Sequence, residues 1–387
     1  MTGLLIVIYI VFVSLGLPDS LFGVSWPVLH LEFGVPESFA SLYSIITGIC
    51  TGGVSFVAGS VIRRFGTGRV TFYSTLLTVV GLIGISFSPN LMVMMVFAVI
   101  MGYGAGAIDT GLNNYVSLHY EARHMNWLHC FWGLGVTISP MIMSMFLDGR
   151  DGGWRTGYRV VAALQFAIAI LVMLTLNKWG SESSHAETGD LHQVPDKTFG
   201  QLIGMKGVCT SILSLGFYCG GEFILGTWGA SYAVNVYGLA PDAAAMWVSL
   251  YYGGIMLGRI VAGFVSMKVS DSNMIKGGMV ISAVGMVILA LPIGPLALAG
   301  LLLIGFGYGP VFPSVLHSVP GRFGMDYSAD ITGYHMGGAY MIGFGLQLLF
   351  GLLTSVSGFA ITPVVLLVLC GGVLTATVTT LNALKNK

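Results

Sequence analysis

Apolar residues fill most of the chain in long stretches that short polar segments separate. An α-helix needs about 20 consecutive apolar residues to cross the hydrocarbon core of a bilayer. The pattern predicts twelve such spans, at residues 4–30, 37–62, 70–88, 91–118, 125–147, 157–179, 201–236, 243–268, 274–292, 295–318, 328–356 and 360–383. We therefore expect an all-α membrane protein with twelve transmembrane helices.

The longest polar segment, residues 180–200, lies between the sixth and seventh predicted spans. Its serines, histidines and acidic residues indicate a flexible linker. The segment divides the chain into an N-terminal six-helix bundle, residues 1–179, and a C-terminal six-helix bundle, residues 201–387.

Composition supports a membrane protein and excludes several other classes. The chain is 55% hydrophobic and 8% charged, whereas soluble proteins carry about 25% charged residues. The formal net charge is zero, which suggests no nucleic-acid partner. The five cysteines follow no metal-binding spacing, and no hydrolase or metalloprotease motif is present. We predict no enzyme activity, no metal and no cofactor, and we expect a monomer in the lipid bilayer.

The Lys and Arg residues between the spans predict the orientation. With the N-terminus in the cytoplasm, twelve of them fall inside: Arg63, Arg64, Arg69, Arg123, Lys178, Lys197, Lys206, Lys268, Lys276, Arg322, Lys385 and Lys387. Three fall outside: Arg150, Arg155 and Arg159. By the positive-inside rule, both termini and the linker are cytoplasmic in a plasma membrane or bacterial inner membrane.

The two predicted halves resemble each other in sequence. Four segments match in order at offsets of 203 to 206 residues: "GLPDSLFGVSW" with "CGGEFILGTWG", "VAGSV" with "VAGFV", "MGYGAG" with "IGFGYG", and "WLHC" with "GYHM". The alignment places Asp19 on Glu222 and His129 on His335. We infer a duplicated six-helix unit in parallel orientation, an arrangement in which substrates bind between the halves near the membrane midplane. The glycine runs are assigned to close helix packing.

Ionisable residues inside the spans are the candidates for function. A charge at the centre of a bilayer costs about 2.5–3.5 kcal/mol on insertion scales, so such residues are rare unless they are used. The deeply placed ones are Asp19, Asp109, Glu222, Arg259, His129 and His335.

Asp109 and Asn113 are spaced to lie on one face of the fourth span. A carboxylate beside an amide can bind hydroxyl groups, as in sugar sites. A hydrogen bond between helices is the structural alternative, worth about 0.6 kcal/mol on average.

His129 and Trp132 share a face of the fifth span. Trp132 suits the apolar face of a sugar ring, although it could equally pack. His129 could carry protons, since its ordinary pKa is about 6.5, or could be a satisfied structural residue.

Arg259 cannot lose its charge and therefore needs a carboxylate or backbone carbonyls as partners. We expect a structural ion pair. Glu222 could be that partner, or it could bind protons or substrate; the sequence leaves both open.

Several of these segments resemble the major facilitator superfamily. The segment "AGSVIRRFGTGR" between spans two and three keeps Gly59, Arg64, Gly66 and Arg69 of the superfamily's loop motif, with Arg63 where an Asp is usual. Within the superfamily, the chain is most similar to the fucose–proton symporter family, including relatives that resemble sodium–glucose transporters.

The narrower resemblance rests on particular spans. It matches Asp19 in span one, "DTGLN" in span four, "NWLHCFWGLG" in span five and "FYCGGEFILGTW" in span seven. It also matches "GR" at 258–259 and "FP" at 312–313. Span five keeps Asn126, Phe131, Gly133 and Gly135, whereas Trp132 replaces the family's sugar-contacting Asn.

The resemblance implies cation-coupled symport of a monosaccharide or similar small polar solute by alternating access. It assigns coupling to Asp19 and Asp109, with Glu222 as a further candidate. The expected substrate-binding residues are Asp19, Asp109, Asn113, His129, Trp132, Glu222 and His335. A proton is favoured as the coupling ion, and sodium is the alternative.

Two other functions remain open from the residues alone. A proton-driven exporter of apolar compounds would suit a cavity rich in Met and aromatic residues, and the chain has 20 Met. A membrane sensor or scaffold would call for an added soluble domain, and none is predicted.

Overall fold

The computed structural model describes residues 2–120, 122–147, 153–179, 198–291, 293–324 and 328–385. Some residues singled out above lie outside this description, in position or in side chain. They are Gly59, Arg63, Arg123, Asn126, Arg150, Lys197 and Lys387, together with residues 180–197 of the predicted linker.

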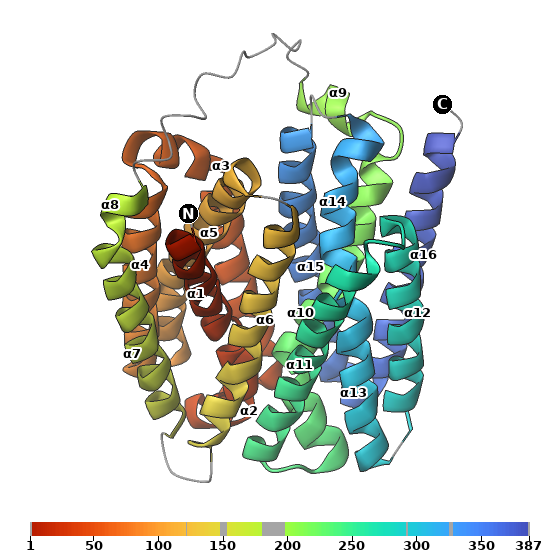
Figure 1. Cartoon of the computed structure of the whole chain (residues 1–387). Coiled ribbons are helices and arrows are strands. Elements are labelled where there is room, and N and C mark those ends of the chain that lie inside the picture. The colour runs from red at the N-terminus through yellow and green to blue at the C-terminus, as the bar shows by residue number, and fades with distance from the viewer. Residues whose placement is uncertain are drawn as a thin grey trace. The chain divides into compact units, whose positions relative to one another are not determined.

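The first half of the chain folds into eight helices within the described ranges (Figure 1). They are α1 (Thr2–Asp19), α2 (Leu21–Phe33), α3 (Ala40–Phe65), α4 (Thr67–Ser86), α5 (Leu91–His119), α6 (Ala122–Ser144), α7 (Gly153–Leu174) and the short α8 (Leu176–Trp179). Together α1 and α2 form the first predicted span.

The second half contributes eight more helices to the described chain. They are the short α9 (Phe199–Ile203), then α10 (Val208–Tyr237), α11 (Pro241–Val265), α12 (Asp271–Leu289), α13 (Gly294–Tyr308), α14 (Val311–Phe323), α15 (Ser328–Ser357) and α16 (Thr362–Lys385). Together α13 and α14 form the tenth predicted span.

Every predicted span coincides with one of these helices or with a pair of them. Ten segments of the described chain are long and apolar enough to cross a membrane, with α1 joined to α2 and α13 joined to α14. The remaining two predicted spans correspond to α3 and α6. The prediction of an all-α membrane fold is confirmed.

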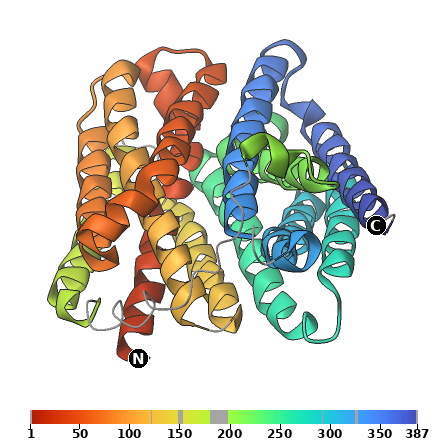
Figure 2. The same ribbon diagram turned by 90° about the horizontal axis from the view of Figure 1, so that it is seen from above.

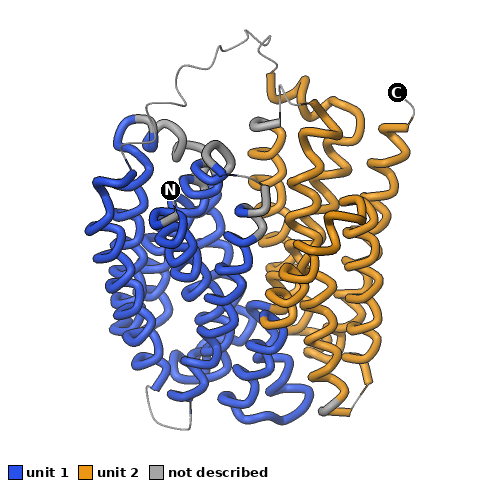
Figure 3. Tube along the Cα trace, in the orientation of Figure 1, with its two compact units in different colours: residues 1–188, 226–252 blue, residues 189–225, 253–387 orange. Residues whose placement is uncertain are grey.

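The helices group into two compact units, coloured separately in Figure 3. Unit 1 consists of residues 1–188 and 226–252, and unit 2 of residues 189–225 and 253–387. The later part of α10 and the first part of α11 therefore belong to unit 1. The division into bundles 1–179 and 201–387 was drawn from sequence order, and it stays a prediction.

In unit 1, alternate glycines on α5 bring it into contact with two helices. An added Cβ at Gly102 or Gly106 would lie 2.7 or 2.4 Å from a carbonyl of α3, and one at Gly104 would lie 2.6 Å from the carbonyl of Ser74 on α4. Figure 2 shows the same helices from above. Small residues allow such backbone approach, which supports the assignment of this glycine run to packing.

In unit 2, the matching glycine run on α13 has the same role. A Cβ at Gly307 would lie 2.2 Å from the carbonyl of Gly278 on α12. Phe306, its neighbour on α13, presents its carbonyl to Gly258 of α11, where a Cβ would lie 2.2 Å away. The two repeats therefore use glycine at matching positions for matching helix contacts.

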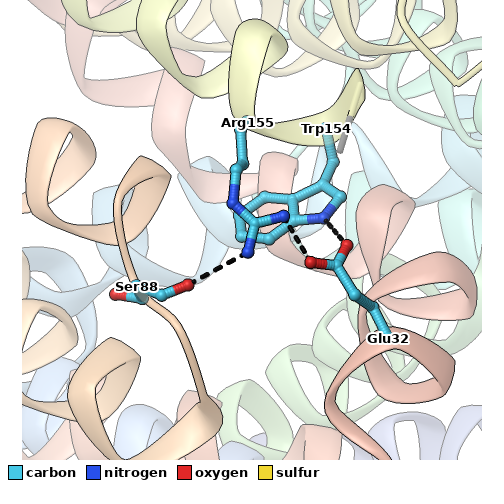
Figure 4. Close-up of polar contacts among 4 residues, drawn as sticks. All are labelled: Glu32, Ser88, Trp154 and Arg155. Carbon is cyan, nitrogen blue, oxygen red and sulfur yellow. Dashed lines mark hydrogen bonds and ion pairs between the residues drawn. The ribbon is translucent and has the colours of Figure 1, made fainter. Parts of the chain in front are cut away.

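A polar cluster joins α7 to two other parts of unit 1 (Figure 4). Arg155 forms an ion pair with Glu32 at the end of α2 and donates to the Ser88 carbonyl at 3.2 Å. The Trp154 indole donates to the other Glu32 carboxylate oxygen at 2.6 Å. The Arg155 guanidinium also lies 4.2 Å from the centre of the Trp154 ring. These contacts hold the start of α7 against α2 at the predicted outer side.

Helices α1 and α6 of unit 1 cross where two glycines face each other. A Cβ at Gly16 would lie 2.3 Å from the Trp132 carbonyl, and one at Gly135 would lie 2.2 Å from the Val13 carbonyl. Only glycine fits at either position without moving a backbone. This crossing positions the side chains one turn away, among them Asp19 and Trp132.

We expect Gly135→Ala to lower the free energy of unfolding by about 1–3 kcal/mol, because the new methyl overpacks the crossing. Gly371→Ala on α16 is the matched control, since a Cβ there meets nothing within 4 Å. Thermal unfolding of both variants in detergent measures the difference. Equal melting temperatures would contradict the close crossing.

Candidate functional site

Asp19 lies where the first span changes from α1 to α2. Pro18 precedes it inside α1, and Ser20 separates the two helices. The Ser20 hydroxyl donates to the Val136 carbonyl of α6 at 3.1 Å. Proline interrupts helical hydrogen bonding, and neighbouring groups must then satisfy the backbone. The break is consistent with the local loosening that Pro18 predicts.

The Asp19 side chain is exposed although it lies in the middle of an apolar span. Every other residue from Ser14 to Pro27 is buried. A carboxylate within a span is tolerated when it faces water or a partner rather than hydrocarbon. Asp19 is therefore the one residue of this stretch whose side chain is left accessible by the packing of the protein.

Trp132 of α6 is a direct partner of this carboxylate. Its indole Nε1–H donates to Asp19 Oδ2 at 2.8 Å. The Trp132 ring also meets the Tyr252 ring edge to face, with 6.4 Å between centroids and 83° between planes. Both candidates that the sequence identified separately, Asp19 and Trp132, thus belong to one hydrogen-bonded pair.

Tyr252 is held in place by the segment of α10 and α11 that belongs to unit 1. A Cβ at Gly226 would lie 2.3 Å from the Tyr252 hydroxyl, and one at Gly23 would lie 2.1 Å from the Gly226 carbonyl. Ser249, one turn before Tyr252, donates to the Thr137 carbonyl of α6 at 2.7 Å. The segment is therefore anchored on α2 and α6 beside Trp132.

Tyr43 of α3 adds a further aromatic group to this part of unit 1. Its ring stacks on Phe22 with 3.7 Å between centroids. The hydroxyl lies within electrostatic range of Asp19, and it has no hydrogen-bond partner among the described residues. A buried hydroxyl normally has such a partner. Tyr43 is therefore a candidate donor near the carboxylate.

Asp109 and Asn113 share one face of α5, as their spacing predicts. Asn113 Nδ2 donates to the Asp109 carboxylate at 2.7 Å and to its backbone carbonyl at 3.0 Å. Both residues are half-buried. This contact lies within one helix, so it differs from the bond between helices considered as the alternative.

His129 is half-buried on α6 and contacts α1 through its ring. It meets Phe12 edge to face at 5.8 Å between centroids. A different histidine of α6, His124, forms a hydrogen bond with the Tyr9 hydroxyl at 2.8 Å. The structure thus packs His129 against α1, and a role in proton transfer stays a prediction.

Glu222 of α10 and Arg259 of α11 both belong to unit 2 and lie within electrostatic range of each other. Both side chains are buried, with 7% and 5% of their surface exposed. The Arg259 guanidinium interacts electrostatically with the Glu222 carboxylate, and Tyr218 lies one helical turn before Glu222. Two opposite charges removed from water stabilise each other, while each alone is strongly disfavoured. This arrangement fits the expected structural pairing of Arg259.

His335 of α15 is fully buried in unit 2. Its Nδ1 lies 2.8 Å from the Ile331 carbonyl, and its Nε2 lies 2.8 Å from the Ser211 hydroxyl. Both ring nitrogens therefore have protein partners. These contacts are those of a structural histidine, and substrate binding by His335 stays a prediction.

Sequence reasoning missed Tyr252 and Tyr43. Tyr252 is preceded by Tyr251 and followed by two glycines in the middle of an apolar span, a pattern that could have marked it. Tyr43 carries no local signal, since its relation to Asp19 depends on the packing of α3. The described residues contain no group of three or more His, Cys, Asp or Glu that could hold a metal ion.

Comparison with known proteins identifies the family. The model of the Major Facilitator Superfamily matches residues 8–347. The chain belongs to the major facilitator superfamily. The superfamily consists of membrane transporters rather than enzymes, and the predicted membership is confirmed.

Among curated relatives, the chain is similar to the glucose/mannose transporter GlcP of Bacillus subtilis. The two are 24% identical over 287 residues, which cover 70% of this chain and 67% of the relative. The human sodium-dependent glucose transporter 1 is 23% identical over 303 residues, covering 68% of this chain and 57% of the relative.

Solved structures share the fold. The fucose–proton symporter FucP of E. coli, whose N162A form has also been solved, matches with a TM-score of 0.67 and 14% identity, covering 97% of this chain and 98% of the other. A D-xylose–proton symporter matches with a TM-score of 0.75 and 13% identity, covering 98% and 97%. At this identity the likeness extends to the fold alone.

The Glu222–Arg259 pair predicts a double-mutant result. Arg259→Met should lower the free energy of unfolding by about 3–5 kcal/mol, because it leaves a buried carboxylate without its cation. Glu222→Gln combined with Arg259→Met should lower it by clearly less than the sum of the single changes.

Thermal unfolding of the two single variants and the double variant measures this coupling. The matched control combines Glu222→Gln with Arg322→Met, since the Arg322 side chain donates to Ser272 elsewhere in unit 2. The control pair should be additive. Additive losses for Glu222 and Arg259 would contradict the pairing.

Proposed function

We propose that the protein is a secondary active transporter that carries a monosaccharide, or a similar small polar solute, together with a proton. The observation that carries this proposal is Asp19: an exposed carboxylate within the first transmembrane span, hydrogen-bonded to Trp132. Membership of a transporter superfamily and the sugar-transporting relatives support it.

Asp19 is suited to couple proton movement to a conformational change. When it is ionised, it carries a charge that apolar surroundings would disfavour by about 2.5–3.5 kcal/mol. Protonation removes this charge, so the site can then lose contact with water at a smaller cost. A transporter that closes around Asp19 only when Asp19 is protonated moves one proton in each cycle.

The neighbouring groups are suited to a hydroxylated substrate. The Asp19 carboxylate can accept from hydroxyl groups, and the Trp132 and Tyr252 rings offer apolar faces of the kind that sugar rings pack against. The Asp109–Asn113 pair offers a second set of acceptors and donors. Asp109 and Glu222 remain further candidates for coupling, and His129 and His335 remain candidates for substrate binding.

Sodium is the alternative coupling ion, and one relative is named for its dependence on it. Sodium would require several oxygen ligands around one point, whereas a proton requires one basic group. Asp19 supplies the latter, so we favour the proton. We further propose, from the distribution of Lys and Arg, that both termini lie in the cytoplasm, and that the protein acts as a monomer in the bilayer.

A ligand screen tests the substrate class. Thermal unfolding of the purified protein should shift upward with one or more of D-glucose, D-mannose, D-xylose and L-fucose, because a ligand that binds the folded state stabilises it. The same panel with sodium replaced by potassium should give the same shifts. Stabilisation by hydrophobic cations and by none of the sugars would contradict the proposal and favour an exporter.

Asp19→Asn should abolish sugar accumulation against a gradient while leaving the fold intact. The amide keeps an oxygen acceptor for Trp132 but cannot exchange a proton near neutral pH. Uptake into energised vesicles and thermal unfolding measure the two effects. Asp242→Asn, in the first turn of α11, is the control and should accumulate normally. Undiminished uphill uptake by Asp19→Asn would remove Asp19 from the coupling role.

A further inference from the structure

The Trp132 indole has a single polar group, and the structure shows where it is directed. Indole Nε1–H is a donor and has no acceptor capacity. In the structure it donates to Asp19 Oδ2 at 2.8 Å, a distance typical of a well-formed N–H···O hydrogen bond. The indole therefore occupies a position on the carboxylate that another hydroxyl or N–H donor could take.

Because α1 and α6 are tightly packed where they cross, only the side chains of Asp19 and Trp132 can move in their contact. Gly16 and Gly135 bring the backbones of α1 and α6 together one turn from Asp19 and Trp132. Because this crossing has no free space, α1 and α6 cannot easily shift relative to each other there. A change at the carboxylate is accommodated by rotation of the Trp132 ring about its own χ angles.

Rotation of the Trp132 ring would change its contact with α11. The ring meets Tyr252 edge to face, and the Tyr252 hydroxyl lies against Gly226 of α10 with no room for a methyl group between them. Helices α10 and α11 each have residues in both units. The contact therefore connects Asp19 to the two helices that the units share.

We propose that Trp132 acts as an internal substitute for the substrate and thereby determines specificity. Its N–H holds Asp19 in the absence of substrate, and a substrate hydroxyl must replace that N–H to bind. When a substrate hydroxyl replaces the indole N–H, the Trp132 ring turns away from Tyr252. Substrate binding thereby changes a contact of α11, which packs against α10. The inference rests on the proposed sugar–proton symport.

The need to replace the Trp132 N–H on Asp19 determines which ligands would be selected. A ligand without a hydroxyl donor cannot replace the indole on Asp19, because it offers no hydrogen to the carboxylate oxygen that the indole N–H occupies. A hydroxylated ring can do so, and the displaced indole is free to lie against its apolar face. Trp132 thus discriminates polyhydroxylated solutes from apolar ones of similar size.

Binding measurements on two variants test the substitution. Trp132→Phe keeps an aromatic ring and removes the competing N–H, so D-glucose or D-mannose should bind roughly ten-fold more tightly, the effect of losing one hydrogen bond to a charged group. Trp127→Phe, on the same helix and half exposed, is the control and should bind as the parent protein does. Unchanged or weaker binding by Trp132→Phe would overturn the proposal.

Fluorine NMR of protein labelled with 5-fluorotryptophan follows the ring itself. The Trp132 resonance is assigned by its loss in Trp132→Phe. It should move in Asp19→Ala, which removes the acceptor, without any ligand, and it should move in the parent protein when D-glucose or D-mannose is added. The Trp127 resonance should stay in place in both cases.

The outcomes separate this inference from the proposed function. A sugar could raise the melting temperature without moving the Trp132 resonance. In that case Trp132 does not act as a substitute for the substrate, and the proposal of a sugar transporter is retained. If none of D-glucose, D-mannose, D-xylose and L-fucose binds the parent protein by any measure, both are overturned, even if Asp19→Ala moves the resonance.

Discussion

A carboxylate in the middle of a membrane span is the constraint on which the arrangement of unit 1 depends. An ionised Asp19 is tolerated because α6 supplies a donor, the Trp132 indole, and because the side chain reaches solvent. The indole can reach it only because Gly16 and Gly135 let α1 and α6 touch at backbone distance. The close packing of α1 on α6 is therefore what allows the hydrogen bond to Asp19 at the candidate site.

The two halves of the chain place their aligned carboxylates in different environments. Glu222, which aligns with Asp19, is buried in unit 2 and lies with Arg259. Asp19 is exposed and bonded to a neutral donor. The repeat thus places one carboxylate in a buried position near a cation and the other in an exposed position beside a neutral donor.

Much of the fold follows from the sequence, because a bilayer accepts only long apolar helices and their lengths are visible in the pattern. The Asp109–Asn113 contact was predictable for a similar reason, since residues four apart share a helix face. Asp19 and Trp132 were each predictable from the sequence as candidate site residues, but the contact between them was not. It depends on where α1 crosses α6, and Tyr252 and Tyr43 depend on still more distant packing.

The central claim is that sugar and proton move together through the site around Asp19. The most direct measurement is the pH change on adding D-glucose or D-mannose to weakly buffered proteoliposomes with no ion gradient. Symport makes the outside medium more alkaline as sugar enters, whereas D-sorbitol or an equal osmotic load of sucrose has no such effect. Sugar entry without any pH change would contradict it.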